Sequence, residues 1–200
     1  MKKFSNYEQA KKNAEYQGSA QLPEGAYPCR IMAVRYQDGK DGNSDSIAIQ
    51  YDITEGEYKD FFRKQYDNDT REDKKWKGKT TIWVPSDDGS EKDNWTKDAF
   101  ARWTNAIEES NPGYAWDWDE GKWKDKLVGI IYGSVGTVID GKEIIYTEAR
   151  FPISVEKARK GDYKPAKFKK KNGYKGSNNS PANGDDFMVP PAGEAEEIPF

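Results

Sequence analysis

The sequence predicts one mainly β domain, and three observations lead to that prediction. Apolar residues between positions 21 and 155 recur mostly at every second place, which is the period of a half-buried strand. Turn-forming sequences rich in glycine separate these alternating segments, and only one segment has the period of an amphipathic helix. A chain of 200 residues with 34% hydrophobic and 34% charged side chains suits one domain of ordinary size better than two.

Five segments carry the strand pattern. They are residues 25–36, 45–53, 57–66, 126–138 and 142–153. Glu55-Gly56 lies between the second and third segments and Asp140-Gly141 between the fourth and fifth, so we expect a hairpin at each place. A further apolar stretch, residues 80–85, suits only a short edge strand because Pro85 ends it.

One segment, residues 95–110, has the helical period. The apolar side chains on its predicted face are Trp95, Ala99, Trp103, Ala106 and Ile107. Asp93 and Asn94 are suited to cap its start, and Asn111-Pro112-Gly113 ends it.

The resulting order is three strands, one helix and two strands. A five-stranded Greek-key barrel with a helix between its third and fourth strands has this order, which predicts an OB-fold, with a small β-sandwich as the alternative. The predicted parts are a flexible arm (1–20), the barrel (21–155), a basic extension (156–172) and a disordered acidic tail (173–200). The tail contains too few apolar residues to offset the entropy of ordering it.

Composition excludes several classes of function. Cys29 is the only cysteine and histidine is absent, which excludes an internal disulfide, ordinary zinc sites, and Ser-His or Cys-His nucleophile pairs. We therefore expect a protein that is not an enzyme and needs no cofactor. No apolar run approaches the length of a membrane span and the first residues lack a signal-peptide core, so we expect a cytoplasmic protein.

Charge is sorted along the chain, although the formal net charge is only -3. Residues 156–175 hold nine basic and two acidic side chains, a local charge of +7, whereas residues 185–200 hold five acidic side chains and no basic one. The chain also has 7 Trp, 12 Tyr and 8 Phe, so we expect some rings to face outward. Basic grooves combined with exposed rings are typical of proteins that bind single-stranded nucleic acid.

The last eight residues, GEAEEIPF, form the most specific motif of the sequence. An acidic run followed by Ile-Pro-Phe resembles the end of bacterial and phage single-stranded DNA-binding proteins. The resemblance implies that this tip recruits replication or recombination proteins. The residues that would bind the partner are Glu194, Glu196, Glu197, Ile198, Pro199 and Phe200. A partner would hold the terminal ring in an apolar pocket and pair its basic residues with the carboxylates.

A second, looser resemblance covers the predicted barrel. The segments LPEGAYPCRIMAVRY, IQYDITEGEYKDFF and KLVGIIYGSV look similar to small phage-encoded single-strand binders and recombination accessory proteins, without a diagnostic motif. This resemblance implies a phage protein that acts in the bacterial host cell. The linker to the tail is short, unlike the long Gly/Gln tract of the common bacterial members.

The expected third strand, residues 57–66, supplies both rings and basic side chains. The predicted DNA-binding residues from this segment are Lys59, Phe61, Arg63, Lys64 and Tyr66. An OB-fold binds oligonucleotides on strands two and three, so one face of this segment would stack bases and contact phosphates. We favour the face of Lys59, Phe61 and Arg63, because it combines an aromatic ring with two basic side chains and has no acidic side chain.

Two other strands are expected to border the same groove. Lys142, Tyr146 and Arg150 lie on the last hairpin, whose loop also contributes to binding in this fold. Arg30 and Tyr36 share a predicted face of the first strand. The basic extension, which has interleaved rings, suits contact with a polyanion or serves as a solvated linker.

The Trp- and Asp-rich segment at 115–123 is interpreted as a packing cluster, because it lacks the spacing of a calcium loop.

These observations predict a protein that binds single-stranded DNA without base specificity. Two alternatives belong to other classes. A carbohydrate-binding β-barrel would also expose rings, but it leaves the basic extension and the GEAEEIPF motif without a role. A metal-dependent nuclease using the Asp-rich loops would show cleavage that requires magnesium. The salt dependence of binding separates the first alternative from DNA binding.

Overall fold

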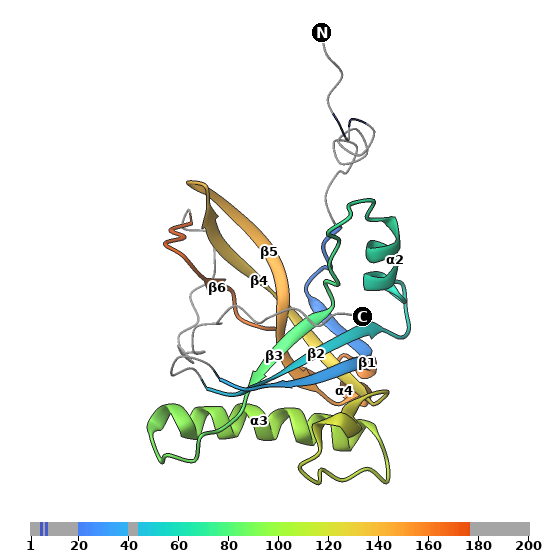
Figure 1. Cartoon of the computed structure of the whole chain (residues 1–200), viewed down its shortest axis with the longest axis vertical. Coiled ribbons are helices and arrows are strands. Elements are labelled where there is room, and N and C mark those ends of the chain that lie inside the picture. The colour runs from blue at the N-terminus through green and yellow to red at the C-terminus, as the bar shows by residue number, and fades with distance from the viewer. Residues whose placement is uncertain (1–4, 6, 8–19, 40–43, 177–200) are drawn as a thin grey trace.

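The computed structural model describes residues 5, 7, 20–39 and 44–176. Over these residues the chain is mainly β, with a six-stranded sheet and few helices (Figure 1). The elements are β1 (Gly25–Gln37), β2 (Ser46–Ile53), α2 (Phe61–Asn68), β3 (Lys79–Trp83), α3 (Glu91–Ser110), the 3-10 helix η1 (Glu120–Trp123), β4 (Leu127–Ile139), β5 (Lys142–Ile153), α4 (Val155–Lys160) and β6 (Lys169–Lys170).

The strands follow the order β3-β2-β1-β4-β5, and each neighbouring pair is antiparallel. β6 pairs in parallel with β4 at Val135 and Gly136, beyond the end of the β1–β4 ladder. β3 and β5 do not pair, so the described sheet is not closed into a barrel, and the closed barrel that we expected is not formed. Residues of α2 and residues 20–22 line the space between these two edges.

The strand expected over residues 57–66 is wrong. A turn at residues 56–60 leads directly into α2, and the third strand of the sheet is β3, which lies in the stretch we assigned to a short edge strand. Gly56 and Asp60 both have positive φ, at 79° and 57°, so they end the extended conformation. The rings of Phe62 and Tyr66 are four residues apart, which fits one face of a helix as well as alternation fits a strand.

The helix expected over residues 95–110 is confirmed and begins earlier, at Glu91. Ser90 caps it, because its Oγ accepts the N–H of Asp93 at 3.1 Å. Asp93 is not the cap; its Oδ1 instead accepts the N–H groups of Ser86 and Asp87 at 2.9 and 3.0 Å, which holds the preceding loop against the helix. α3 packs along the lower side of the sheet in Figure 1, opposite α2.

A β-bulge in β1 separates two residues that we placed on one face. The register with β2 shifts between Ile31 and Ala33, so Arg30 lies opposite Asp52 whereas Tyr36 lies opposite Ile47. Ile47 is a core residue and Asp52 points to the other face, so the single extra residue reverses the alternation. Arg30 and Tyr36 therefore do not share a face.

The β4–β5 hairpin is confirmed and reaches beyond the rest of the sheet (Figure 1). Asp140 and Gly141 form its two-residue turn with φ of 49° and 73°, the pair of positive values that a tight hairpin requires. Its far end exposes Ile139, Ile144 and Ile145.

The expected basic extension packs on the body of the protein. α4 and the residues after it cover one face of β4, where a Cβ at Gly133 would lie 2.5 Å from the Cβ of Ala166. The ion pairs of this segment are Lys157 with Glu109, Arg159 with Glu55, Lys160 with Glu156, and both Lys169 and Lys171 with Glu148. Five of the nine basic side chains of residues 156–175 thus pair with four carboxylates, three of which lie outside the segment, so the segment contributes to the packing of the protein body.

The packed body extends to Gly176, past the expected start of the tail at Gly173. The ring of Tyr174 lies 5.7 Å from that of Phe168, and both rings contact the position of Gly136 on β4. The predicted tail tip at 194–200 and most of the predicted arm lie outside the described residues. Among the described residues, no helix has the length and apolar character that crossing a bilayer requires.

Candidate functional site

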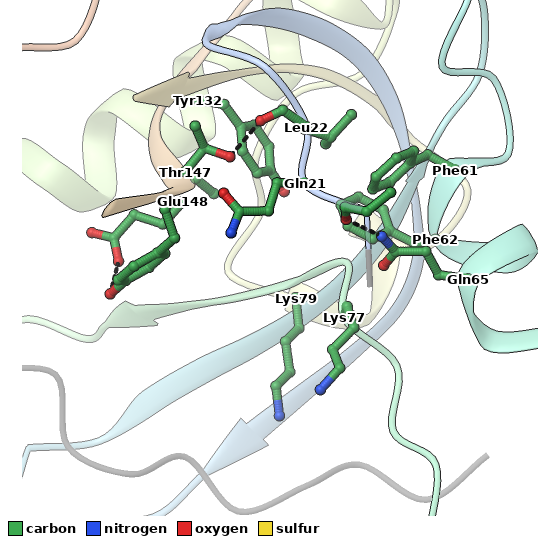
Figure 2. A pocket seen from close by; sticks show the side chains of 13 residues that line it. Gln21, Leu22, Phe61, Phe62, Gln65, Lys77, Lys79, Tyr132, Thr147 and Glu148 are labelled. Carbon is green, nitrogen blue, oxygen red and sulfur yellow. Dashed lines mark hydrogen bonds between the residues drawn. The ribbon is translucent and has the colours of Figure 1, made fainter. Parts of the chain in front are cut away.

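The open edges of the sheet border a pocket of about 380 Å³, which we call the β3–β5 pocket. Its lining comes from five separate parts of the chain. The residues are Ala20, Gln21, Leu22, Phe61, Phe62, Gln65, Lys77, Lys79, Tyr132, Tyr146, Thr147, Glu148 and Ala149. Figure 2 shows the rings of Phe61, Phe62 and Tyr132 around the pocket, and Lys77 and Lys79 on the opposite side with their amino groups pointing away from these rings. The pocket thus combines an apolar wall with amide, hydroxyl and ammonium groups.

A buried carboxylate fixes the helix that forms one wall. Asp52, at the end of β2, accepts the N–H groups of Phe62 at 3.0 Å and Arg63 at 3.1 Å, which are free at the start of α2. It also accepts the N–H of Ile53 at 2.9 Å. Burial raises the pKa of Asp52, while these three donors act in the opposite direction. A residue of β2 therefore caps α2 and determines which side of the helix faces the pocket.

The aromatic wall continues from α2 into the core. The ring of Phe62 lies 5.7 Å from that of Tyr51 and 6.5 Å from that of Tyr132. The hydroxyls of Tyr51 and Tyr132 share a hydrogen bond of 2.6 Å, and burial raises the pKa of both, so both stay protonated at neutral pH. The pocket therefore rests on a rigid cluster of rings.

Gly78 places the two lysines of the pocket. Its carbonyl accepts the N–H of Tyr51 at 2.8 Å and the indole N–H of Trp76 at 3.1 Å, which joins this segment to the edge of β2. The N–H of Lys79 donates to the carbonyl of Lys77 at 2.9 Å, forming a three-residue turn around Gly78. The turn brings the two lysine side chains next to each other on the same side of the chain (Figure 2).

Replacing Gly78 with alanine should lower the free energy of unfolding. A Cβ at this position would lie 2.3 Å from the carbonyl oxygen of Tyr51 and 2.5 Å from the ring of Phe62, so the segment must move away from β2. We expect a cost of about 1–3 kcal/mol, the usual range for overpacking, measured by urea unfolding. Gly121→Ala is the matched control, since its Cβ meets only the side chain of Asp119, at 3.1 Å. Equal stability of the two variants would contradict the tight fit at Gly78.

Residues 20–24 bridge the two sides of the pocket. The side-chain amide of Gln65 on α2 donates to the carbonyl of Ala20, and the hydroxyl of Thr147 on β5 donates to the carbonyl of Leu22. Glu24 then accepts the N–H of Ser134 on β4 at 2.9 Å. These contacts connect α2 to the β4–β5 hairpin where β3 and β5 do not pair.

The wall on β5 contains one acid whose charge is compensated. Glu148 accepts from Lys171 at 2.7 Å and pairs with Lys169 at 3.9 Å, and the hydroxyl of Tyr146 donates to it at 3.4 Å. Two ammonium groups thus face one carboxylate on this side, and Lys77 and Lys79 lie on the other. The charged side chains that line the pocket are thus Glu148, Lys77 and Lys79.

The pocket brings together only two of the predicted DNA-binding residues. Phe61 and Tyr146 line it. Arg63 and Lys64 lie exposed on α2, and Lys59 lies exposed in the turn before it. Helical spacing explains the separation, because residues 61, 62 and 65 face the pocket and residues 63 and 64 face solvent.

The other predicted residues are held elsewhere. Tyr66 packs on Trp76 with its ring centre 5.9 Å away, and the Nζ of Lys74 lies 4.4 Å from the centre of the Tyr66 ring. Arg150 donates to the carbonyl of Lys167 at 3.2 Å.

Three predicted residues lie away from the pocket. Tyr36 donates its hydroxyl to Asp45, a bond that raises the pKa of Tyr36 to about 12. Arg30 is exposed on the other face of β1, and Lys142 is at the tip of the β4–β5 hairpin.

Sequence reasoning missed Lys77, Lys79, Gln21, Gln65 and Thr147 as site residues. Gln65 and Thr147 gave no signal, because their role depends on elements far apart in the chain. The two lysines did give a signal in the sequence. In Lys77-Gly78-Lys79, a glycine stands between two basic residues at the start of a short strand. A glycine in that place indicates close approach of the backbone to another group.

The Trp-rich segment lies on the α3 side of the sheet. Trp123 is fully buried, and its ring centre is 4.8 Å from that of Trp116, which agrees with a packing cluster. Trp118 is 81% exposed. Within the described ranges, no group of three or more His, Cys, Asp or Glu side chains is placed to hold a metal ion.

No protein-family model matches this chain, and no curated protein sequence matches it either.

Proposed function

We propose that this protein binds single-stranded DNA without base specificity and has no catalytic role. The observation that carries the proposal is the β3–β5 pocket, whose lining includes both Lys77 and Lys79 and the rings of Phe61 and Tyr146. A single strand needs both kinds of group, because its phosphates are held by cations and its bases by aromatic surfaces. The bases of duplex DNA are stacked and paired inside the helix, so they are not accessible to an aromatic pocket of this kind.

The topology supports an open form of the OB-fold as the framework of this site. Strand order β3-β2-β1-β4-β5, with α3 between β3 and β4, is the order of a five-stranded Greek-key barrel in which strands three and five have separated. An OB-fold binds oligonucleotides on strands two and three and on the loop between strands four and five. In this chain, β3 and the β4–β5 hairpin border the pocket.

Exposed basic residues extend the proposed surface beyond the pocket. Lys59, Arg63 and Lys64 lie on the solvent side of α2 and its preceding turn, and Lys142 lies at the hairpin tip. A strand that leaves the pocket in either direction would meet positive charge. We propose that these residues contact phosphates and that Phe61 and Tyr146 contact bases.

The biological setting is proposed from the sequence motifs. The GEAEEIPF segment resembles the partner-binding tip of single-stranded DNA-binding proteins, so we propose that it recruits proteins of replication or recombination. The similarity of the body to phage-encoded binders supports a role in phage DNA metabolism in a bacterial cell.

The proposal is tested by titrating the full chain with a thymidine homopolymer and following tryptophan fluorescence. Trp76 packs against the segment that holds the pocket lysines, so its emission should change on binding. The logarithm of the association constant should fall linearly with the logarithm of salt concentration, with a slope of about -0.7 for each phosphate contacted. Duplex DNA of the same length should bind far more weakly. Binding that does not depend on salt, or equal affinity for duplex, would overturn the proposal.

A further inference from the structure

The far end of the β4–β5 hairpin exposes aliphatic side chains on both of its faces (Figure 1). Ile139 is 52% exposed, Ile144 39% and Ile145 56%, and among the described residues no other Ile, Leu or Met is exposed. Thr137 lies opposite Ile144 and Gly136 opposite Ile145, so these two isoleucines point to opposite faces. We call the three exposed side chains the isoleucine patch. A patch of this kind at one end of a hairpin is suited to bind another apolar segment.

β5 also has a free backbone edge at the isoleucine patch. The two-residue turn makes alternate residues of β5 bond to β4, so the N–H and C=O groups of Glu143 and Ile145 point away from β4. Gly136 agrees with this alternation, because its carbonyl points away from β5 and accepts the N–H of Lys171 at 2.8 Å. Within the described ranges, no backbone group bonds to the main chain of Glu143 or Ile145 on that edge. The edge is therefore suited to pair with an extended segment.

The described part of the chain ends beside this edge. The carboxylate of Glu143 accepts the N–H groups of residues 175–176 at 2.9 and 3.3 Å. The ring of Tyr174 packs 2.7 Å from the place of a Cβ at Gly136, on the face that Ile145 shares. The segment that follows residue 176 thus begins next to the isoleucine patch, where the preceding residues already cover part of the hairpin.

We propose that the apolar segment Phe187-Met188-Val189 of the same chain binds the isoleucine patch. Its side chains cover Ile144 and Ile145, and its backbone pairs with the free edge of β5. The segment lies outside the described residues. The inference goes beyond the proposed function, because this contact within one chain needs no DNA.

Composition and charge favour residues 187–189 as the occupant. They are the only run of three apolar residues between positions 177 and 197. Asp185 and Asp186 precede them, and Lys142 is exposed at the tip of the hairpin, so the charges on the two sides are opposite. Two prolines, at 190–191, follow the run, and since proline has no N–H, pairing with a strand edge would end there.

The length of chain allows the contact. Residues 177–186 connect the end of the described body to the segment, and ten residues span up to roughly 35 Å when extended. Because the segment belongs to the same chain, its effective concentration at the patch is on the order of millimolar, so a weak contact is enough to keep it bound. The GEAEEIPF motif begins after the segment and stays available to a partner protein.

The first test is amide hydrogen exchange, measured by NMR on the full ¹⁵N-labelled chain without DNA. In the variant Phe187→Ser/Met188→Ser/Val189→Ser, we expect the amides of Glu143 and Ile145 to exchange at least about threefold faster than in the wild type. The amide of Ile144 bonds to β4, so its exchange should not change. The matched control is Ile198→Ser/Phe200→Ser, which removes apolar side chains from the end of the tail and should leave all three rates as they are.

A second measurement follows the methyl group of Met188, one of three methionines in the chain. In Ile145→Lys, a change at an exposed position that the fold should tolerate, the Met188 methyl signal should move to its position in a free peptide of residues 185–191. Trp118→Ser removes another exposed side chain, on the α3 side of the sheet, and should leave that signal unmoved.

Three results would overturn the inference. Exchange rates that do not change in the triple variant would show that residues 187–189 do not cover the edge. An equal increase in the control variant would assign the contact to the end of the tail. Protection of Glu143 and Ile145 that falls on tenfold dilution of the wild type would mean that a second copy of the chain covers the edge. Because these tests contain no DNA, each result leaves the proposed single-strand binding to its own titration.

Discussion

Replacing Lys77 and Lys79 together with alanine is expected to weaken single-stranded DNA binding by roughly 30- to 150-fold at low salt. This range takes about 1 to 1.5 kcal/mol for each charge-assisted contact between an ammonium group and a phosphate. The fold should survive, because the lysine side chains are exposed and the segment is held by Gly78 and Trp76. Unfolding in urea should therefore resemble that of the wild type.

The salt dependence of the same variant gives a second measurement. Losing two phosphate contacts should make the slope of log association constant against log salt less steep by about 1.4. Lys92→Ala, which removes an exposed charge from α3 on the far side of the sheet, should leave both the affinity and the slope nearly unchanged. Equal losses in the Lys92 variant and in the pocket variant would mean that binding responds to overall charge and that the pocket is not its centre.

Arg63→Ala tests the face that we favoured from sequence. Arg63 is exposed on α2 next to the pocket, so its loss should flatten the slope by about one contact, or about 0.7, with a smaller fall in affinity than the lysine pair gives. A larger effect for Arg63 than for the lysine pair would place the main phosphate contacts on α2.

Sequence reasoning succeeded where the pattern of a segment depended on its own residues. The alternation of apolar residues predicted β1, β2, β4 and β5, although β2 is buried at every position, and Asp140-Gly141 fixes the hairpin because both residues tolerate positive φ. α3 was visible in the same way, since it is long and its apolar residues recur with the helical period.

Residues 57–66 show where local pattern was insufficient. Their rings and charges fit a period of two and a helical face equally well, so the decision came from elsewhere in the chain. Asp52 on β2 supplies the acceptors for the first N–H groups of α2, and the left-handed conformation of Asp60 turns the chain into the helix. A cap provided by a distant strand leaves no signature in the helical segment itself.

The pocket was not predictable for a related reason. Closure of the barrel depends on whether β3 reaches β5, and the groups between them come from α2 and residues 20–22. None of these segments carries a motif for its partner. The one-residue bulge in β1 had a similar consequence, because it reverses every side chain after Ile31 and moves Tyr36 to the face opposite Arg30.

Removing residues 185–200, by truncation after Gly184, is expected to strengthen single-stranded DNA binding several-fold at low salt. These residues hold five carboxylates and no basic side chain, and because they belong to the same chain as the proposed DNA-binding surface, we expect them to act at an effective concentration on the order of millimolar. They should therefore compete with the phosphates of DNA. The difference from the full chain should shrink as salt rises and the Debye length shortens. A full-length variant with all five acids changed to their amides should bind DNA as the truncated protein does.

Deleting only Ile198, Pro199 and Phe200 should separate the recruitment of partner proteins by the tail from its competition with DNA. All five acidic side chains remain, so DNA affinity should stay nearly unchanged. Capture of replication or recombination proteins from a bacterial extract, with the full chain as the reference bait, should be abolished, because an apolar ring beside carboxylates is the anchor that a partner pocket recognises. Unchanged capture by the three-residue deletion would show that the resemblance of GEAEEIPF to the tip of single-strand binders is accidental. If the deletion abolishes capture and also changes DNA affinity, the acidic side chains and the three terminal residues do not have separate roles.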